Sequence, residues 1–102
     1  MKKLPSLSKT EFLIVDLLVR RREMYGLEMV KEDARLKRGT IYVLLDRLEE
    51  KGFVRSKQVS EPGVSGLPRR VYSITGTGAR AQAAFQAAAA VFDLGPDLPE
   101  SA

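Results

Sequence analysis

Residues 37–47 contain the side-chain types that proteins use to contact nucleic acids. Lysine and arginine can bind phosphate oxygens or guanine edges, while hydroxyl and apolar groups can contact the edges of bases. The candidate DNA contacts in this stretch are Lys37, Arg38, Thr40, Tyr42, Val43 and Arg47. The alternative is an ordinary surface helix whose charges are only solvated.

A helix over residues 39–51 would position these side chains. Its apolar residues recur at the spacing of one helical face: Ile41, Leu44, Leu45 and Leu48. Gly52 then suits the left-handed position that ends a helix. A short helix anchored by one apolar face fits the major groove of DNA. For Tyr42 we keep a structural alternative, in which its ring packs on a preceding helix at about residues 26–33, whose expected core contacts are Leu27 and Val30.

Two predicted strands, residues 53–59 and 69–75, follow this helix. The segment between them favours a turn, because residues 61–68 contain two prolines and two glycines. Alternation along the second strand places Arg69 outward and the stem of Arg70 inward. The candidate DNA contacts in this hairpin are Ser65, Gly66, Arg69 and Arg70.

The positive charge of the chain is concentrated around these candidates. The formal net charge is +4, but residues 35–72 hold nine lysines and arginines against four acidic residues. Residues 1–34 hold seven against six, and residues 73–102 hold one against three. A local excess of cations is what phosphate neutralisation requires, although many solvated surfaces are also basic.

Two further predicted helices have more apolar surface than a small domain needs. The helix over residues 8–21, capped by Ser8, is apolar around most of its circumference and must be buried on several sides. The helix over residues 76–92 has a heptad-like apolar stripe. We predict a homodimer with the interface residues Phe12, Val15, Ala81, Phe85, Ala88 and Phe92. The alternatives are a first helix at the centre of a single core, and a last helix folded back onto its own first helix.

The order of elements predicts a mainly α fold with a small β-hairpin. This order, three helices and then a hairpin, is that of a winged helix-turn-helix, here followed by a C-terminal dimerisation helix. We expect a DNA-binding domain over residues 1–75, the dimerisation helix over 76–94 and a flexible tail over 95–102.

Several classes of function are disfavoured by the composition. The chain has no cysteine and no histidine, which excludes disulfides, thiolate zinc sites and histidine-based catalysis. Its carboxylates are scattered and its glycines match no phosphate-binding loop, so we expect no enzyme activity, metal site or cofactor. No apolar run reaches transmembrane length and the start has no long signal core, so we expect a cytoplasmic protein without a membrane partner.

The chain resembles the PadR-like family of transcriptional regulators over about residues 7–94. The similar residues are Leu7-Ser8, Glu11-Phe12-Leu13-Ile14, Met24-Tyr25-Gly26-Leu27-Glu28, Gly39-Thr40-Ile41-Tyr42, Leu45, Arg47-Leu48-Glu49, Gly52-Phe53-Val54, Pro68-Arg69-Arg70-Val71-Tyr72-Ser73-Ile74-Thr75 and Gly78. The resemblance implies a homodimeric cytoplasmic repressor that dimerises through its C-terminal helix. It also implies that a small aromatic or drug-like effector releases DNA in some members.

Three features depart from the family pattern. Val43 stands where members commonly have proline, the segment between the second and third helices is short, and no larger effector domain follows. The leading hypothesis is a repressor that binds a palindromic operator as a homodimer. An effector pocket would lie near the dimer interface, lined by Phe12, Val15, Phe85 and Phe92. The alternative is a winged helix that binds another protein, for which Val64 and Leu67 in the turn segment would be exposed contacts.

Overall fold

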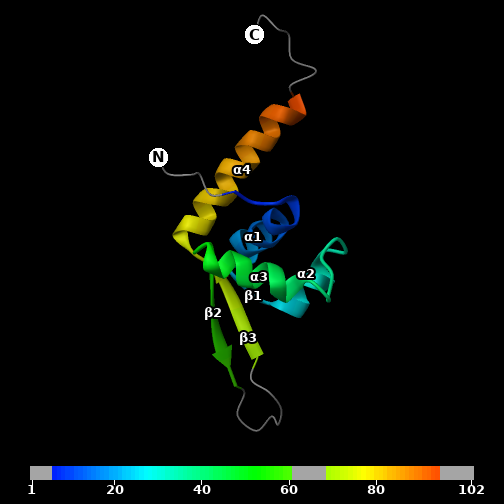
Figure 1. Cartoon of the computed structure of the whole chain (residues 1–102), viewed down its shortest axis with the longest axis vertical. Helices are drawn as coiled ribbons and strands as arrows, with labels where there is room; N and C mark the ends of the chain where they lie inside the picture. Colours follow the sequence, from blue (N-terminus) through cyan, green and yellow to red (C-terminus); the bar gives the residue numbers. More distant parts are fainter. Residues whose placement is uncertain (1–5, 61–68, 95–102) are drawn as a thin grey trace, which may run out of the picture.

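The computed structural model describes residues 6–60 and 69–94, with side chains described up to residue 91. Three helices, α1, α2 and α3, lie together with a small sheet, and the last helix, α4, extends away from them (Figure 1). In chain order the elements are α1 (Lys9–Arg21), β1 (Glu23–Tyr25), α2 (Gly26–Glu32), α3 (Ile41–Glu50), β2 (Val54–Val59), β3 (Arg69–Ile74) and α4 (Gly76–Leu94). The predicted fold class is confirmed. No helix within the described ranges is long and apolar enough to cross a membrane.

Helix α1 begins where the sequence predicts, because a capping box of Ser8 and Glu11 closes its first turn. The Ser8 hydroxyl accepts a hydrogen bond from the Glu11 amide at 3.1 Å, and the Glu11 carboxylate accepts one from the Ser8 amide at 2.8 Å. Lys51 reaches back from the end of α3 and lies 3.0 Å from the same carboxylate. Lys51 therefore joins two helices within the fold.

The sheet has three antiparallel strands in the order β1-β3-β2. It therefore contains one strand, β1, in addition to the predicted hairpin. The sequence analysis missed β1, whose three residues are too few to show alternation. Its place is set by tertiary pairing: Met24 lies opposite Tyr72, and both side chains are buried. We use the term wing for the β2–β3 hairpin.

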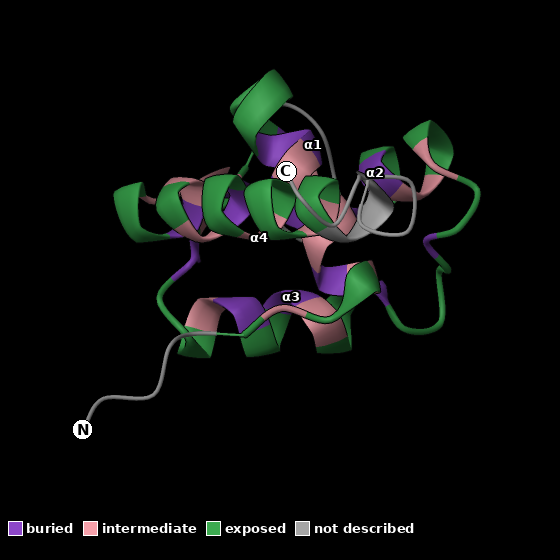
Figure 2. Ribbon diagram, turned by 90° about the horizontal axis from the view of Figure 1, so that it is seen from above, coloured by how far each residue is buried: buried purple, intermediate pink, exposed green. Residues whose placement is uncertain are grey.

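The hydrophobic core lies between the sheet and helices α1, α2 and α3. Its largest buried side chains include Tyr72, Phe53 and Ile14. Figure 2 shows the buried residues of α3 on its side toward α1 and α4, and exposed residues on the opposite side. The expectation that Leu27 enters the core was wrong: Leu27 is 40% exposed, and Met29 is buried instead.

Helix α4 packs on α1 of its own chain through its first half. The rings of Phe12 and Phe85 stack with centroids 4.6 Å apart, and the Gln82 side chain donates a hydrogen bond to Asp16 at 3.0 Å. At the start of α4, Gly78 allows the helix to lie against the backbone of Phe53, because a Cβ atom there would overlap the Phe53 carbonyl oxygen. The alternative in which the last helix folds back onto its own first helix is therefore what the structure shows for this half of α4.

Candidate nucleic-acid interface

The N-terminal end of α3 is exposed and is anchored from behind by the core. Ile41, Leu45 and Leu48 are completely buried. On the other side of the helix, Tyr42 and Val43 are 44% and 53% exposed. The predicted contacts Lys37, Arg38, Thr40 and Arg47 are exposed as well. Thr40 is the N-cap residue, so the segment before it brings Lys37 and Arg38 to this end of the helix.

The two ends of α3 differ in charge. Its first turn contains no acidic residue, and the two cations before it add positive charge there. Further along, Asp46 and Glu50 are exposed on either side of Arg47 in the sequence. The end that can approach a polyanion is therefore the N-terminal end. Net charge per segment, the quantity used in the sequence analysis, does not reveal this polarity.

Tyr42 combines both arrangements expected for it. Its ring lies over the start of α2, where a Cβ atom on Gly26 would come within 2.8 Å of the Tyr42 Cε1 atom. Nearly half of the side chain nevertheless remains exposed. Gly26 thus leaves room for the ring, and the packing fixes where Tyr42 is presented.

The two described candidate cations of the wing make different contacts within the chain. The Arg69 guanidinium lies over the ring of Tyr25, with its Cζ atom 5.2 Å from the ring centroid. Arg70 donates a hydrogen bond to the Ser56 hydroxyl at 3.2 Å, and that hydroxyl donates to Glu49 of α3 at 2.9 Å. This pattern agrees with the expected alternation. Ser65 and Gly66, as well as Val64 and Leu67, lie outside the described residues.

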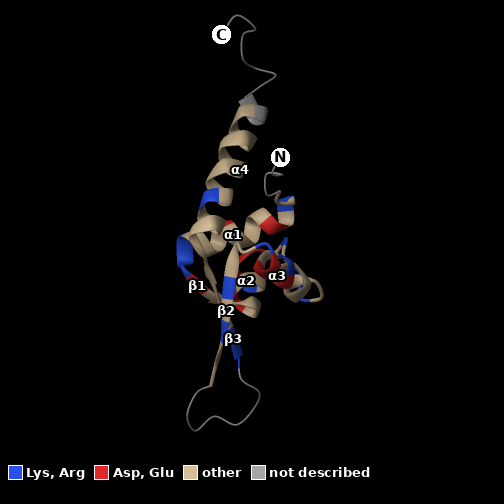
Figure 3. Cartoon of the chain, turned by 60° about the vertical axis from the view of Figure 1, so that its left-hand side comes forward, with Lys and Arg blue, Asp and Glu red and all other residues tan. Residues whose placement is uncertain are grey.

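Other charged groups of the basic segment are engaged within the fold. Arg35 forms an ion pair with Asp33 at 2.7 Å, and its hydrogen bonds hold the pKa of Asp33 below the usual value. Burial by itself would raise the pKa of Glu11, but the Ser8 amide and Lys51 outweigh burial, so this pKa is also lowered. Arg55 and Lys57, which were not among the predicted contacts, are exposed on β2. Figure 3 shows lysines and arginines along the strands of the wing.

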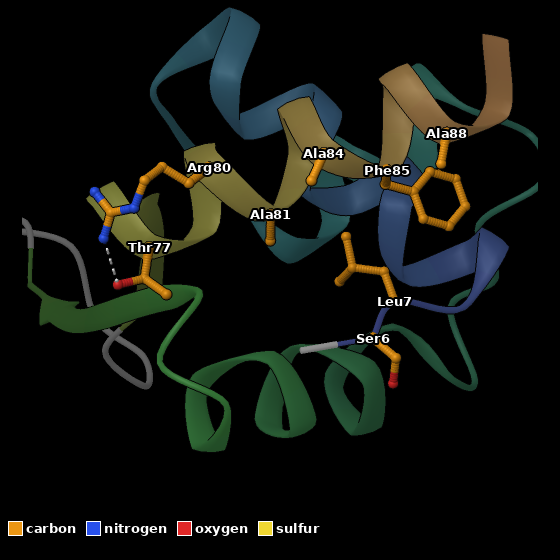
Figure 4. A pocket seen from close by; sticks show the side chains of 8 residues that line it. All are labelled: Ser6, Leu7, Thr77, Arg80, Ala81, Ala84, Phe85 and Ala88. Carbon is orange, nitrogen blue, oxygen red and sulfur yellow. Dashed lines mark hydrogen bonds between the residues drawn. The ribbon is translucent and has the colours of Figure 1, made fainter. Parts of the chain in front are cut away.

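A second open region runs along α4. A groove of about 480 Å³ is lined by Ser6, Leu7, Thr77, Arg80, Ala81, Ala84, Phe85 and Ala88 (Figure 4). Three predicted interface residues line it: Ala81, Phe85 and Ala88. Phe12 instead stacks on Phe85. Val15 is completely buried in the core of its own chain, so its side chain is not available to a partner or to a pocket, and the Phe92 side chain lies outside the description.

The family model and several similar solved structures point to one family. The family model described as the transcriptional regulator PadR-like family matches residues 14–84. A PadR family transcriptional regulator from Eggerthella lenta is 27% identical, with a TM-score of 0.74 and coverage of 86% of this chain and 78% of that chain. One from Clostridium difficile is 28% identical, with a TM-score of 0.68 and coverage of 85% and 94%. No curated protein sequence matches.

A more distant structure shows the same fold with a ligand. Bacillus subtilis PadR, solved in complex with operator DNA, is 22% identical, with a TM-score of 0.68 and coverage of 79% of this chain and 48% of that chain. Because the family model covers well over half of the sequence, the chain belongs to the PadR-like family of transcriptional regulators.

Proposed function

We propose that the protein represses transcription by binding a two-fold symmetric operator as a homodimer. The observation that carries the proposal is the polarity of α3, whose exposed N-terminal end is basic and has no acidic residue in its first turn. In helix-turn-helix proteins the N-terminal residues of the recognition helix contact the edges of bases. The operator complex of Bacillus subtilis PadR supports DNA as the ligand of this fold.

The exposed groups of α3 divide by chemistry into two roles. Lys37 and Arg38 precede the helix and are suited to phosphates, which fix the position of the helix on the duplex. Thr40 and Val43 are suited to base edges and thymine methyl groups. Arg47 lies one turn beyond Val43 and is suited to a guanine edge or to a phosphate. In the wing, Arg69 and Arg70 together with Ser65 and Gly66 would contact the backbone or the adjacent minor groove.

The proposed dimer interface is the groove face of α4. Its alanines allow another helix to approach closely, and Leu7 and Phe85 supply apolar area beside them. Val91, 65% exposed near the far end of α4, extends this uncovered apolar surface. A second copy of α4 would bury it, so the interface consists of Ala81, Phe85 and Ala88, with Phe12 supporting Phe85 from behind.

A small effector would bind near this interface, in the part of the groove that the second α4 leaves open. The groove volume of about 480 Å³ is in the range typical of ligand sites, roughly 300–1,000 Å³. Phe85 would offer a stacking face and Arg80 a cation. An aromatic ligand there would act on the spacing of the two recognition helices through the dimer interface.

Selection of bound fragments from random DNA, followed by fluorescence anisotropy, tests the proposal. We expect a two-fold symmetric consensus whose affinity falls by about 10³–10⁵ between 50 and 200 mM salt if a dimer neutralises about 6–10 phosphates. Absence of a selectable sequence, or binding that salt does not weaken, would contradict DNA recognition and would favour a protein-binding winged helix.

A further inference from the structure

A cleft of about 730 Å³ lies between the base of the wing, helix α2 and the N-terminal end of α3. Four cations and two tyrosines line it: Lys31, Arg38, Arg69, Arg70, Tyr25 and Tyr42. We propose that this cleft binds the sugar-phosphate strand that separates the groove entered by α3 from the groove met by the wing. The inference rests on the proposed function and adds Tyr25 and Lys31 to the DNA-binding residues.

The position of the cleft follows from the geometry of a duplex. The major and minor grooves alternate along DNA, and a single sugar-phosphate strand separates each groove from the next. Arg38 and Tyr42 stand on the α3 side of the cleft, whereas Arg69 and Arg70 stand on the wing side. If α3 and the wing enter neighbouring grooves, the strand between those grooves must pass between these two walls.

The lining has the mixed chemistry of that strand. Within residues 6–60 and 69–94, none of the four cations forms an ion pair, so their charge is available to phosphates. Leu27 and Val30 also line the cleft, and Leu27 and Tyr42 are 40% and 44% exposed. Deoxyribose presents carbon atoms beside each phosphate, so the exposure of these apolar groups fits a sugar-phosphate ligand better than a free ion.

Tyr25 is the positioning residue of the cleft. Its ring supports the Arg69 guanidinium at 5.2 Å through a cation–π contact, which leaves the N–H groups at the edge of the guanidinium free for a phosphate. Glu28 is the acidic residue of the lining, and its carboxylate accepts a hydrogen bond from the Tyr25 amide at 2.7 Å. Glu28 thus fixes the backbone of Tyr25.

Charge removal at two matched lysines tests the assignment. Lys31→Ala removes a cleft cation, whereas Lys57→Ala removes another exposed cation on β2 that does not line the cleft. For selected DNA, Lys31→Ala should lower the slope of log affinity against log salt by about 0.9 per half-site, and Lys57→Ala should not change it. Failure of the wild type to select DNA would refute the proposed function. Equal slopes for both variants with intact selection would refute only the cleft.

Neutral phosphates locate the contact on the DNA. Duplexes with one methylphosphonate at each backbone position in turn should reveal a position whose neutralisation weakens the wild type but not Lys31→Ala. That position should lie between the half-site and the adjacent minor groove. Equal losses for both proteins at every position would overturn the inference.

Two variants of Tyr25 and a change of salt complete the test. Tyr25→Phe keeps the ring and should bind as the wild type does, while Tyr25→Leu should weaken binding only when Arg69 is present. Equal loss from Tyr25→Leu in the Arg69→Ala background would mean a general packing role.

Inorganic phosphate should release DNA no better than chloride at equal ionic strength. Stronger release from the wild type than from Lys31→Ala would identify a site for free phosphate instead.

Discussion

The proposed DNA surface and the α4 groove differ in how far their side chains also pack against other residues of the same chain. Val43 in the first turn of α3 and Arg38 before that helix are exposed and lie outside the hydrophobic core. Phe85 in the groove has two roles, because it lines the groove and also stacks on Phe12 of the same chain. Substitutions on the first surface should therefore change binding alone, whereas those at Phe85 should change folding and association together.

The largest effect should come from a charge placed in the groove. Ala88 is exposed and makes no contribution to the core, so Ala88→Asp should leave the monomer folded. In the dimer it would bury an unpaired carboxylate, at a cost of about 3–5 kcal/mol. We expect a monomer by sedimentation at tens of micromolar, with weak operator binding.

Ala83→Asp is the matched control for this prediction. Ala83 is also an exposed alanine of α4, but it does not line the groove. The Ala83→Asp variant should remain dimeric and bind operator DNA as the wild type does. A dimeric Ala88→Asp protein, or a monomeric Ala83→Asp protein, would assign the interface to another face of α4.

Phe85→Ala should affect both folding and dimerisation, whereas Ala88→Asp should affect dimerisation alone. Truncation of a fully buried phenylalanine costs about 3–5 kcal/mol, and Phe85 is only partly buried, so we expect a loss of about 2 kcal/mol in the free energy of unfolding. Urea denaturation of the Ala88→Asp monomer, with and without this change, measures the intrachain share. No loss in that background would mean that the stacking on Phe12 contributes little.

On the DNA surface we expect effects on binding without effects on folding. Arg47→Ala should cost about 1–3 kcal/mol and relax specificity at one base pair if Arg47 contacts a base, and should weaken all sequences equally if it contacts a phosphate. Glu50→Gln should strengthen binding slightly, because it removes an exposed anion from the same helix. Anisotropy on single-base variants of the selected site distinguishes the two roles. Unchanged affinity in Arg47→Ala would move recognition entirely to the N-terminal end of α3.

Much of the fold could be predicted because its signals are local. The capping box of Ser8 and Glu11 marks the start of α1, and Gly52 ends the turn after α3 with a φ of 80°. Strand β1 carries no such signal, since its three residues become a strand only by pairing with β3. Leu27 was wrongly assigned to the core for a different reason. Helical periodicity over only seven residues does not determine which face of α2 packs against the core.

The candidate site residues were chosen by residue type, and the sequence does not show how they group in space. Lys37, Arg38 and Arg69 could be chosen because cations in a basic segment are visible in sequence. Tyr25 and Lys31 were not selected, because they belong to β1 and α2 and line the same cleft as Arg69 only in the folded chain. One local signal was present: the small residue Gly26 beside Tyr25 is the position that admits the ring of Tyr42.

The smallest expected effect is a pH dependence that concerns neither surface directly. Glu11 at the start of α1 is paired with Lys51, and its pKa in the folded protein lies below the ordinary value of 4.5. A lowered pKa in the folded state stabilises the protein above the pKa of the unfolded chain. This contribution is lost as the pH falls below about 4.5 and through the lower folded value.

Glu11→Gln tests this linkage. The variant should be less stable than the wild type at pH 7, because Lys51 loses its partner, and the difference between the two proteins should shrink as the pH is lowered from 5 toward 3. Urea denaturation of both proteins across this range gives the comparison. A difference that stays constant with pH would show that the cost of Glu11→Gln comes from a weaker capping hydrogen bond to the Ser8 amide rather than from ionisation. Since Lys51 lies at the end of α3 opposite the proposed reading end, operator affinity at neutral pH should change little.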